Sequence, residues 1–82
     1  MEKSIASNDY ALFLSHLRET REKAGMTQER LAESLGQTQS FVSKCERGER
    51  RLDLVEVRAF CIALGVSFPS FVTQFDNLIS RE

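Results

Sequence analysis

The chain has 82 residues, with 11 lysines and arginines against 12 aspartates and glutamates, so its formal net charge is −1. This length predicts one small domain spanning residues 1–82, and an apolar fraction of 41% can build a core, which argues against disorder. The near-neutral charge argues against nucleic-acid binding, because domains that bind phosphate are usually basic overall.

Apolar residues spaced by three and four predict a series of short helices separated by glycines, and therefore an all-α fold of five helices. The first is predicted from Asp9 to about Lys23, with Asn8 or Asp9 as its cap. Its buried face is predicted to hold Phe13, Leu14 and Leu17. Arg21 lies on the same face, four residues after Leu17, and therefore needs an acidic partner in the core.

The next two helices form a close pair around a turn that contains Gly36. The first of them is predicted to begin at the cap Thr27, and the second begins at the cap Thr38 and ends at Gly48. A helix, a short glycine-containing turn and a second helix form the helix-turn-helix pattern, placed here at about 27–47. The outward face of the second helix is polar and consists of Gln39, Ser40, Ser43 and Lys44.

The last two helices carry most of the remaining apolar residues. Asp53 is predicted to cap a helix that ends at Leu64, and Ser67 to cap an apolar helix at about 68–80. The inward residues of the first are predicted to be Leu54, Val57, Phe60, Cys61 and Leu64. In the second, Phe68, Phe71 and Val72 are expected to close the core. Further apolar residues exceed what one small core absorbs and predict a dimer surface, formed by Phe75, Leu78 and Ile79.

Catalytic and metal-binding chemistry finds little support. Cys45 and Cys61 both fall in helical patterns and are expected to be reduced core residues. His16 is expected at the surface or its boundary, without a role, and no metal site, base–nucleophile pair, cofactor or small-molecule ligand is predicted. The protein is therefore predicted not to be an enzyme. The absence of a long apolar run or a signal-peptide pattern predicts a cytoplasmic protein without membrane contact.

The segment MTQERLAESLGQTQSFVSKCERGERRLDL at 26–54, followed by LGVS at 64–67, resembles the XRE or Cro/repressor-like family of helix-turn-helix DNA-binding proteins. The resemblance implies a compact five-helix, lambda-repressor-like domain that binds double-stranded operator DNA, usually as a homodimer. It implies a recognition helix at 38–47, a core at 9–74 and a short N-terminal arm at 1–8.

The resemblance also implies residue roles, each with an alternative. Base contacts are implied for the groove-facing residues Gln39, Ser40, Ser43 and Lys44, although Lys44 could equally contact phosphate and all four could be ordinary exposed residues. Phosphate contacts are expected at Thr27, Gln28, Gln37, Arg47, Arg50 and Arg51. Arg21 and Glu46 fall where the family has an interior ion pair. Phe41 either packs between helices or contacts a thymine methyl group.

The regional charge agrees better with DNA binding than the total does. The segment 37–51 is basic, because Lys44, Arg47, Arg50 and Arg51 outnumber Glu46 and Glu49. No strong acidic run or apolar face adjoins Arg50 and Arg51 in the sequence, which favours phosphate over a solvated loop. The sequence therefore predicts a sequence-specific transcriptional regulator on a near-palindromic operator. The alternative is a protein-interaction module or an antitoxin-type, partner-binding protein on the same fold.

Overall fold

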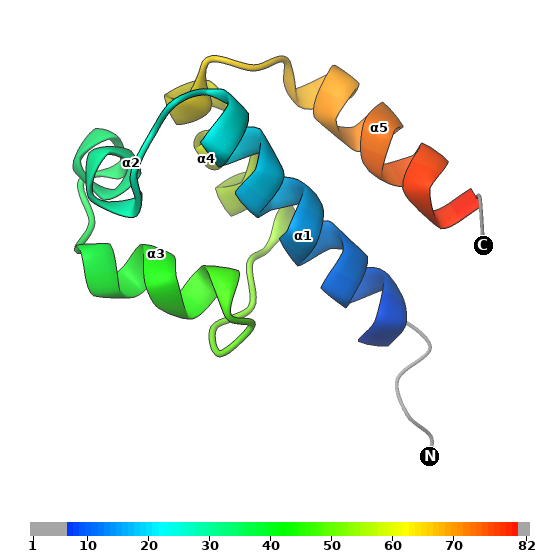
Figure 1. Cartoon of the computed structure of the whole chain (residues 1–82), viewed down its shortest axis with the longest axis horizontal. Coiled ribbons are helices and arrows are strands. Elements are labelled where there is room, and N and C mark those ends of the chain that lie inside the picture. The colour runs from blue at the N-terminus through cyan, green and yellow to red at the C-terminus, as the bar shows by residue number, and fades with distance from the viewer. Residues whose placement is uncertain (1–6, 81–82) are drawn as a thin grey trace.

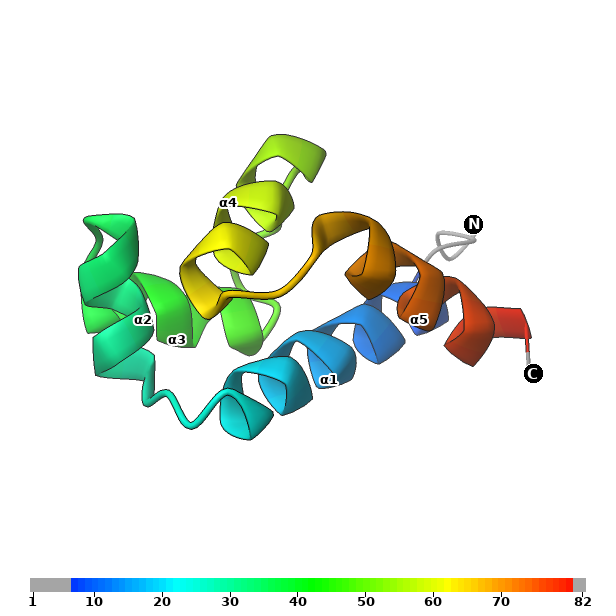
Figure 2. The same cartoon turned by 90° about the horizontal axis from the view of Figure 1, so that it is seen from above.

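The computed structural model describes residues 7–80, and within this range the chain forms five α-helices and no strand. They are α1 (Ser7–Lys23), α2 (Gln28–Leu35), α3 (Gln39–Glu46), α4 (Leu54–Leu64) and α5 (Phe68–Ser80). The predicted all-α fold is therefore confirmed. Figure 1 shows α2 and α3 at one end of the molecule and α5 alongside α1 towards the other, an arrangement that the orthogonal view in Figure 2 repeats.

Side-chain caps begin α2, α3 and α4 where the sequence predicts them. The hydroxyl oxygens of Thr27 and Thr38 accept hydrogen bonds from the backbone N–H three residues later, at 3.0 and 3.1 Å. Asp53 accepts from the backbone of Glu56, whose carboxylate accepts in turn from the backbone of Asp53. Each cap satisfies a helical N–H that has no partner within the helix. Gly36 ends α2 with φ +68°, a left-handed conformation that glycine adopts without a steric penalty.

The start of α1 differs from the prediction. The helix begins at Ser7, so Asn8 and Asp9 lie inside its first turn and the predicted cap at either residue is wrong. The last two residues of the predicted arm at 1–8 therefore belong to α1, and its residues 1–6 lie outside the described part of the chain.

The core forms where α1 meets α3 and α5, and where α2 meets α3 and α4. Fully buried side chains come from all four of the first helices: Leu17, Leu31, Val42, Cys45, Phe60 and Cys61. Both cysteines are free, as predicted, and burial raises the pKa of each thiol. Two residues assigned to the core are instead exposed, Leu54 to 71% and Val72 to 41%, because both line an open groove.

His16 is buried, so its predicted position at the surface is wrong. Its ring stacks on the ring of Phe71, with 4.3 Å between centroids, and its Nε2 donates to the Phe71 backbone carbonyl at 3.2 Å. The imidazole therefore has a structural role, because it joins α1 to α5 across 55 positions of sequence.

Within residues 7–80, no single helix is long and apolar enough to cross a membrane. The pair α4 and α5 passes such a test of length and composition together, although the two helices are bent by 113° where they meet.

Candidate nucleic-acid interface

One side of α3 is polar and faces solvent. The buried residues of this eight-residue helix are Val42, Cys45 and Glu46. An α-helix makes one turn every 3.6 residues, so these three residues share one side of α3 and the opposite side faces outward. The residues predicted to contact bases lie there: Gln39, Ser40 and Lys44 are exposed, and Ser43 is half-buried.

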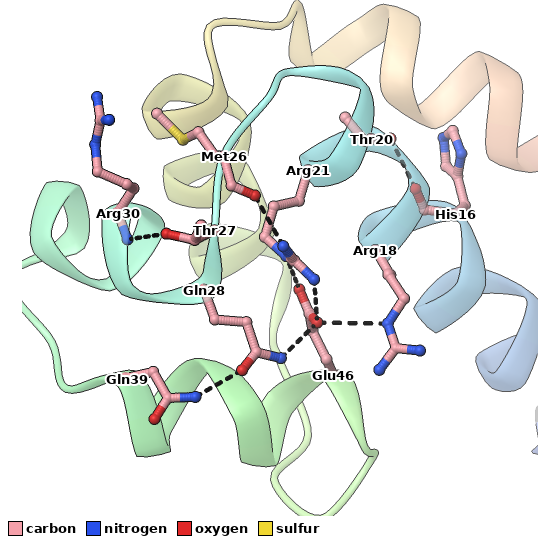
Figure 3. Close-up of polar contacts among 10 residues, drawn as sticks. All are labelled: His16, Arg18, Thr20, Arg21, Met26, Thr27, Gln28, Arg30, Gln39 and Glu46. Atoms are coloured by element: carbon pink, nitrogen blue, oxygen red, sulfur yellow. Dashed lines mark hydrogen bonds and ion pairs between the residues drawn. The ribbon is translucent and has the colours of Figure 1, made fainter.

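The start of α2 lies against the start of α3 through two glutamines. Gln39 Nε2 donates to Gln28 Oε1 at 2.7 Å, and Gln28 Nε2 donates to Glu46 Oε1 at 2.9 Å (Figure 3). Thr27, Gln37 and Gln39 line one hollow there, and Gln28 is bonded to Gln39. The structure places four of the predicted contact residues on one connected surface, and Gln28 links α2 to both ends of α3.

Arg21 and Glu46 form an ion pair beneath this surface. Arg21 Nε and Nη2 donate to the two oxygens of Glu46 at 2.6 and 3.1 Å, and Nη1 donates to the Met26 carbonyl at 2.8 Å (Figure 3). The Glu46 side chain is fully buried and that of Arg21 is 11% exposed. Burial alone would raise the pKa of Glu46, but the hydrogen bonds from Arg21 and Gln28 and the charges of Arg21 and Arg18 hold it below its usual value. Two hydrogen bonds between these side chains thereby join α3 to α1.

The three arginines after α3 have partners that the sequence analysis did not anticipate. Arg47 donates to Glu49 at 2.9 and 3.2 Å and to the hydroxyl of Ser43. Arg50 donates to Glu56 at 2.8 and 3.1 Å, and its guanidinium lies 4.9 Å from the centre of the Phe41 ring.

The guanidinium of Arg51 lies over the ring of Tyr10, at 4.1 Å from its centre. The sequence shows no strong acidic run or apolar face beside Arg50 and Arg51, but folding brings Glu56 of α4 to Arg50 and Tyr10 of α1 to Arg51. Phe41, for which two positions were open, is half-buried with its ring 6.5 Å from that of Phe60, so it packs between helices.

The apolar residues of α5 face two different hollows. Phe75 and Ile79 line a groove of about 500 Å³ together with Leu54 and Val72, with Arg51 and Asp53 at its edge. Leu78 lines a separate hollow beside His16 and Val66. The single patch predicted from Phe75, Leu78 and Ile79 is therefore divided. Phe75 also contributes to the core, with its ring 5.9 Å from that of Phe13.

Two further residues contact this candidate interface and were not predicted from the sequence. Arg18 Nε lies 3.6 Å from Glu46 Oε1, and the sequence places Arg18 three residues before Arg21, a spacing that puts both on one side of a helix. The hydroxyl of Tyr10 accepts from the backbone N–H of Leu52 at 3.1 Å, which joins the first helix to the arginine-rich loop. Among the residues that the structure describes, no group of three or more His, Cys, Asp or Glu is arranged to hold a metal ion.

Comparisons with known proteins assign the fold. A family model described as a helix-turn-helix domain matches residues 13–69. An XRE-family like protein from Pseudomonas syringae pv. tomato str. DC3000 has 40% sequence identity over 90% of both chains, with a TM-score of 0.85. The restriction-modification controller protein C.AhdI from Aeromonas hydrophila has 34% identity over 78% of this chain and 97% of its own, with a TM-score of 0.69.

A mutant of another restriction-modification controller protein, C.Esp1396I, has 26% identity over 89% of this chain and 97% of its own, with a TM-score of 0.82. A search of curated protein sequences gives no match.

Proposed function

This chain belongs to the XRE-type helix-turn-helix family, and on that premise we propose that it is a transcriptional regulator that binds double-stranded DNA. The similar structures named as restriction-modification controllers support a regulatory role. In this proposal α3 enters the major groove, where Gln39 and its neighbours contact base edges, while Thr27, Gln28 and Gln37 contact phosphates.

The observation that carries the proposal is the path of hydrogen bonds from Gln39 through Gln28 to Glu46. Gln39 is exposed, so the path does not serve to bury a polar group. Instead it fixes the direction of a side chain that projects into solvent, and it connects that side chain to a buried ion pair. Fixing an exposed amide in advance reduces the entropy lost when it forms paired hydrogen bonds with a base edge.

We further propose that the regulator is a two-fold dimer on a near-palindromic operator. The groove lined by residues of α1, α4 and α5 supports this, because its lining includes the exposed apolar residues Leu54 and Val72. Arg51 and Asp53 also line the groove, so a two-fold copy could place each of them against the opposite charge. Two recognition helices about 34 Å apart would then enter successive major grooves on one side of the DNA.

Selection of bound duplexes from a random DNA pool tests the function directly. The expected result is enrichment of a site with two inverted halves, whose affinity falls steeply with salt concentration. Failure to enrich any sequence would refute sequence-specific binding. Weak binding with a flat response to salt would favour a protein-interaction module instead.

Val72→Glu tests the dimer surface, with Val55→Glu as the matched control. Both valines are exposed, Val72 beside the groove and Val55 on α4 outside it. We expect Val72→Glu to produce monomers in sedimentation at micromolar concentration, because it places a charge in an apolar contact, and Val55→Glu to leave the dimer intact. Equal behaviour of the two variants would place the contact elsewhere.

A further inference from the structure

Arg18 is a cation on α1 whose charge is incompletely balanced. Its Nε lies 3.6 Å from Glu46 Oε1, and its side chain is 53% exposed. Arg21 already donates to the same carboxylate at 2.6 and 3.1 Å, and Gln28 donates at 2.9 Å. The Glu46 carboxylate therefore faces two guanidinium groups, and since the negative charge of Glu22 also acts on Arg21, Arg18 is the more loosely paired of the two cations.

The loop arginines differ from Arg18 in this respect. Arg47 pairs with Glu49 and Arg50 pairs with Glu56, each through two hydrogen bonds, and Glu56 also accepts from the backbone N–H of Asp53. Among residues 7–80, the carboxylate of Glu46 is the acidic partner of Arg18, and Arg21 holds that carboxylate more closely. A phosphate that approaches the loop must compete with a carboxylate, whereas one that approaches Arg18 meets a guanidinium with donors to spare.

Arg18 also lies on the same polar path as the predicted base contact. Figure 3 shows Gln39, Gln28, Glu46 and Arg18 following one another across α3, α2 and α1, and the two exposed members, Gln39 and Arg18, are its ends. In a DNA complex, base edges inside a groove are flanked by the phosphates of the backbone. Arg18 lies at the far end of the path from Gln39, the proposed base contact. It is therefore placed to meet one of these backbone phosphates.

We propose that Arg18 binds a backbone phosphate of the DNA, with its guanidinium shared between that phosphate and Glu46. The inference rests on the proposed DNA-binding function and adds a contact on α1. The Nε edge of Arg18 faces Glu46, which leaves the two terminal nitrogens for the oxygens of a phosphate. Because Glu46 belongs to α3, a phosphate held by Arg18 also sets the position of the recognition helix relative to the DNA backbone.

Arg18→Gln tests the proposal, with Arg58→Gln as the matched control. Each change removes one positive charge from an exposed arginine, but Arg58 lies on α4, away from Glu46. We expect Arg18→Gln to weaken binding to the selected operator about tenfold at moderate salt, by a similar factor for every operator variant. The slope of log K against log salt should fall by about 0.9 for each copy of Arg18 on the operator. Arg18→Lys, which keeps the charge, should restore that slope.

The outcomes separate this inference from the function on which it rests. If the wild-type chain selects no DNA, the DNA-binding proposal fails and this one fails with it. If the wild-type chain binds and Arg18→Gln has the same affinity and salt slope as Arg58→Gln, the phosphate contact alone is refuted. Loss of folding in Arg18→Gln, measured by thermal melting, would also refute it, because a half-exposed phosphate ligand is dispensable for the fold. The proposal would also be refuted if Arg18→Lys failed to restore the slope of log K against log salt.

Discussion

Replacing Glu46 by glutamine removes the charge from a carboxylate that holds three helices together. The change keeps the shape of the side chain but leaves Arg21, 11% exposed, without a counter-charge. It also turns an acceptor oxygen into an N–H₂ group that faces the donors of Arg21 or Gln28. Breaking a buried ion pair from one side costs about 3–5 kcal/mol.

That loss is large for a chain of this size. At 82 residues, the total free energy of unfolding is expected to be about 4–12 kcal/mol. A loss of 3 kcal/mol in a domain this small lowers the melting temperature by at least about 12 °C. Urea denaturation and thermal melting, both followed by helical circular dichroism, measure the effect.

Two controls identify the cause. Glu49→Gln breaks the ion pair between Glu49 and Arg47, in which both side chains are about half exposed. It should leave the melting temperature nearly unchanged. Replacing both members of the buried pair, as in Arg21→Met with Glu46→Leu, should give a protein more stable than Glu46→Gln, because no lone charge stays buried. If Glu46→Gln melts within a few degrees of the wild type, the pair is not a buried stabilising contact and the reasoning fails.

Acid pH, Gln39 and Gly48 each give a further test. The pKa of Glu46 is lowered in the folded state. The stabilisation that Glu46 provides is therefore complete above its unfolded pKa of about 4.3 and is lost as the pH falls through the lower folded pKa. Urea midpoints should drop in that pH range, and less so for Glu46→Gln. Gln39→Ala should keep the wild-type melting temperature but lose preference at one base pair of each half-site, about 1–3 kcal/mol by competition binding; a uniform loss over all sequences would contradict base contact. Gly48→Ala should destabilise more than Gly65→Ala in thermal melts, because both positions have positive φ but only at Gly48 does an added Cβ meet a side chain, Leu14 Cδ1 at 3.0 Å. Equal losses would show that Leu14 moves freely.

The features that could be predicted from sequence depend on residues close together in the chain. Thr27, Thr38 and Asp53 act within three residues, so their caps lie where the sequence places them. The need of Arg21 for an acid followed from its helical face, and the family resemblance pointed to Glu46.

The features that could not be predicted depend on helices that are far apart in the chain. His16 is buried because α5 covers it, and Arg50 loses its free charge because α4 supplies Glu56. Leu54 follows the helical period of buried residues, yet it lines an open groove and is exposed. Periodicity gives the direction of a side chain around its helix, but not whether another helix is present on that side.

The contact between His16 and Phe71 has a consequence for how the protein is made. A chain is synthesised from its N-terminus, so α1 to α4 are complete before Phe71 is added. Until then the rings of His16 and Phe13 lack their contacts with the ring of Phe71. We therefore expect the helix-turn-helix to assemble first in the nascent chain, and the chain to gain its apolar groove only after α5 has been added.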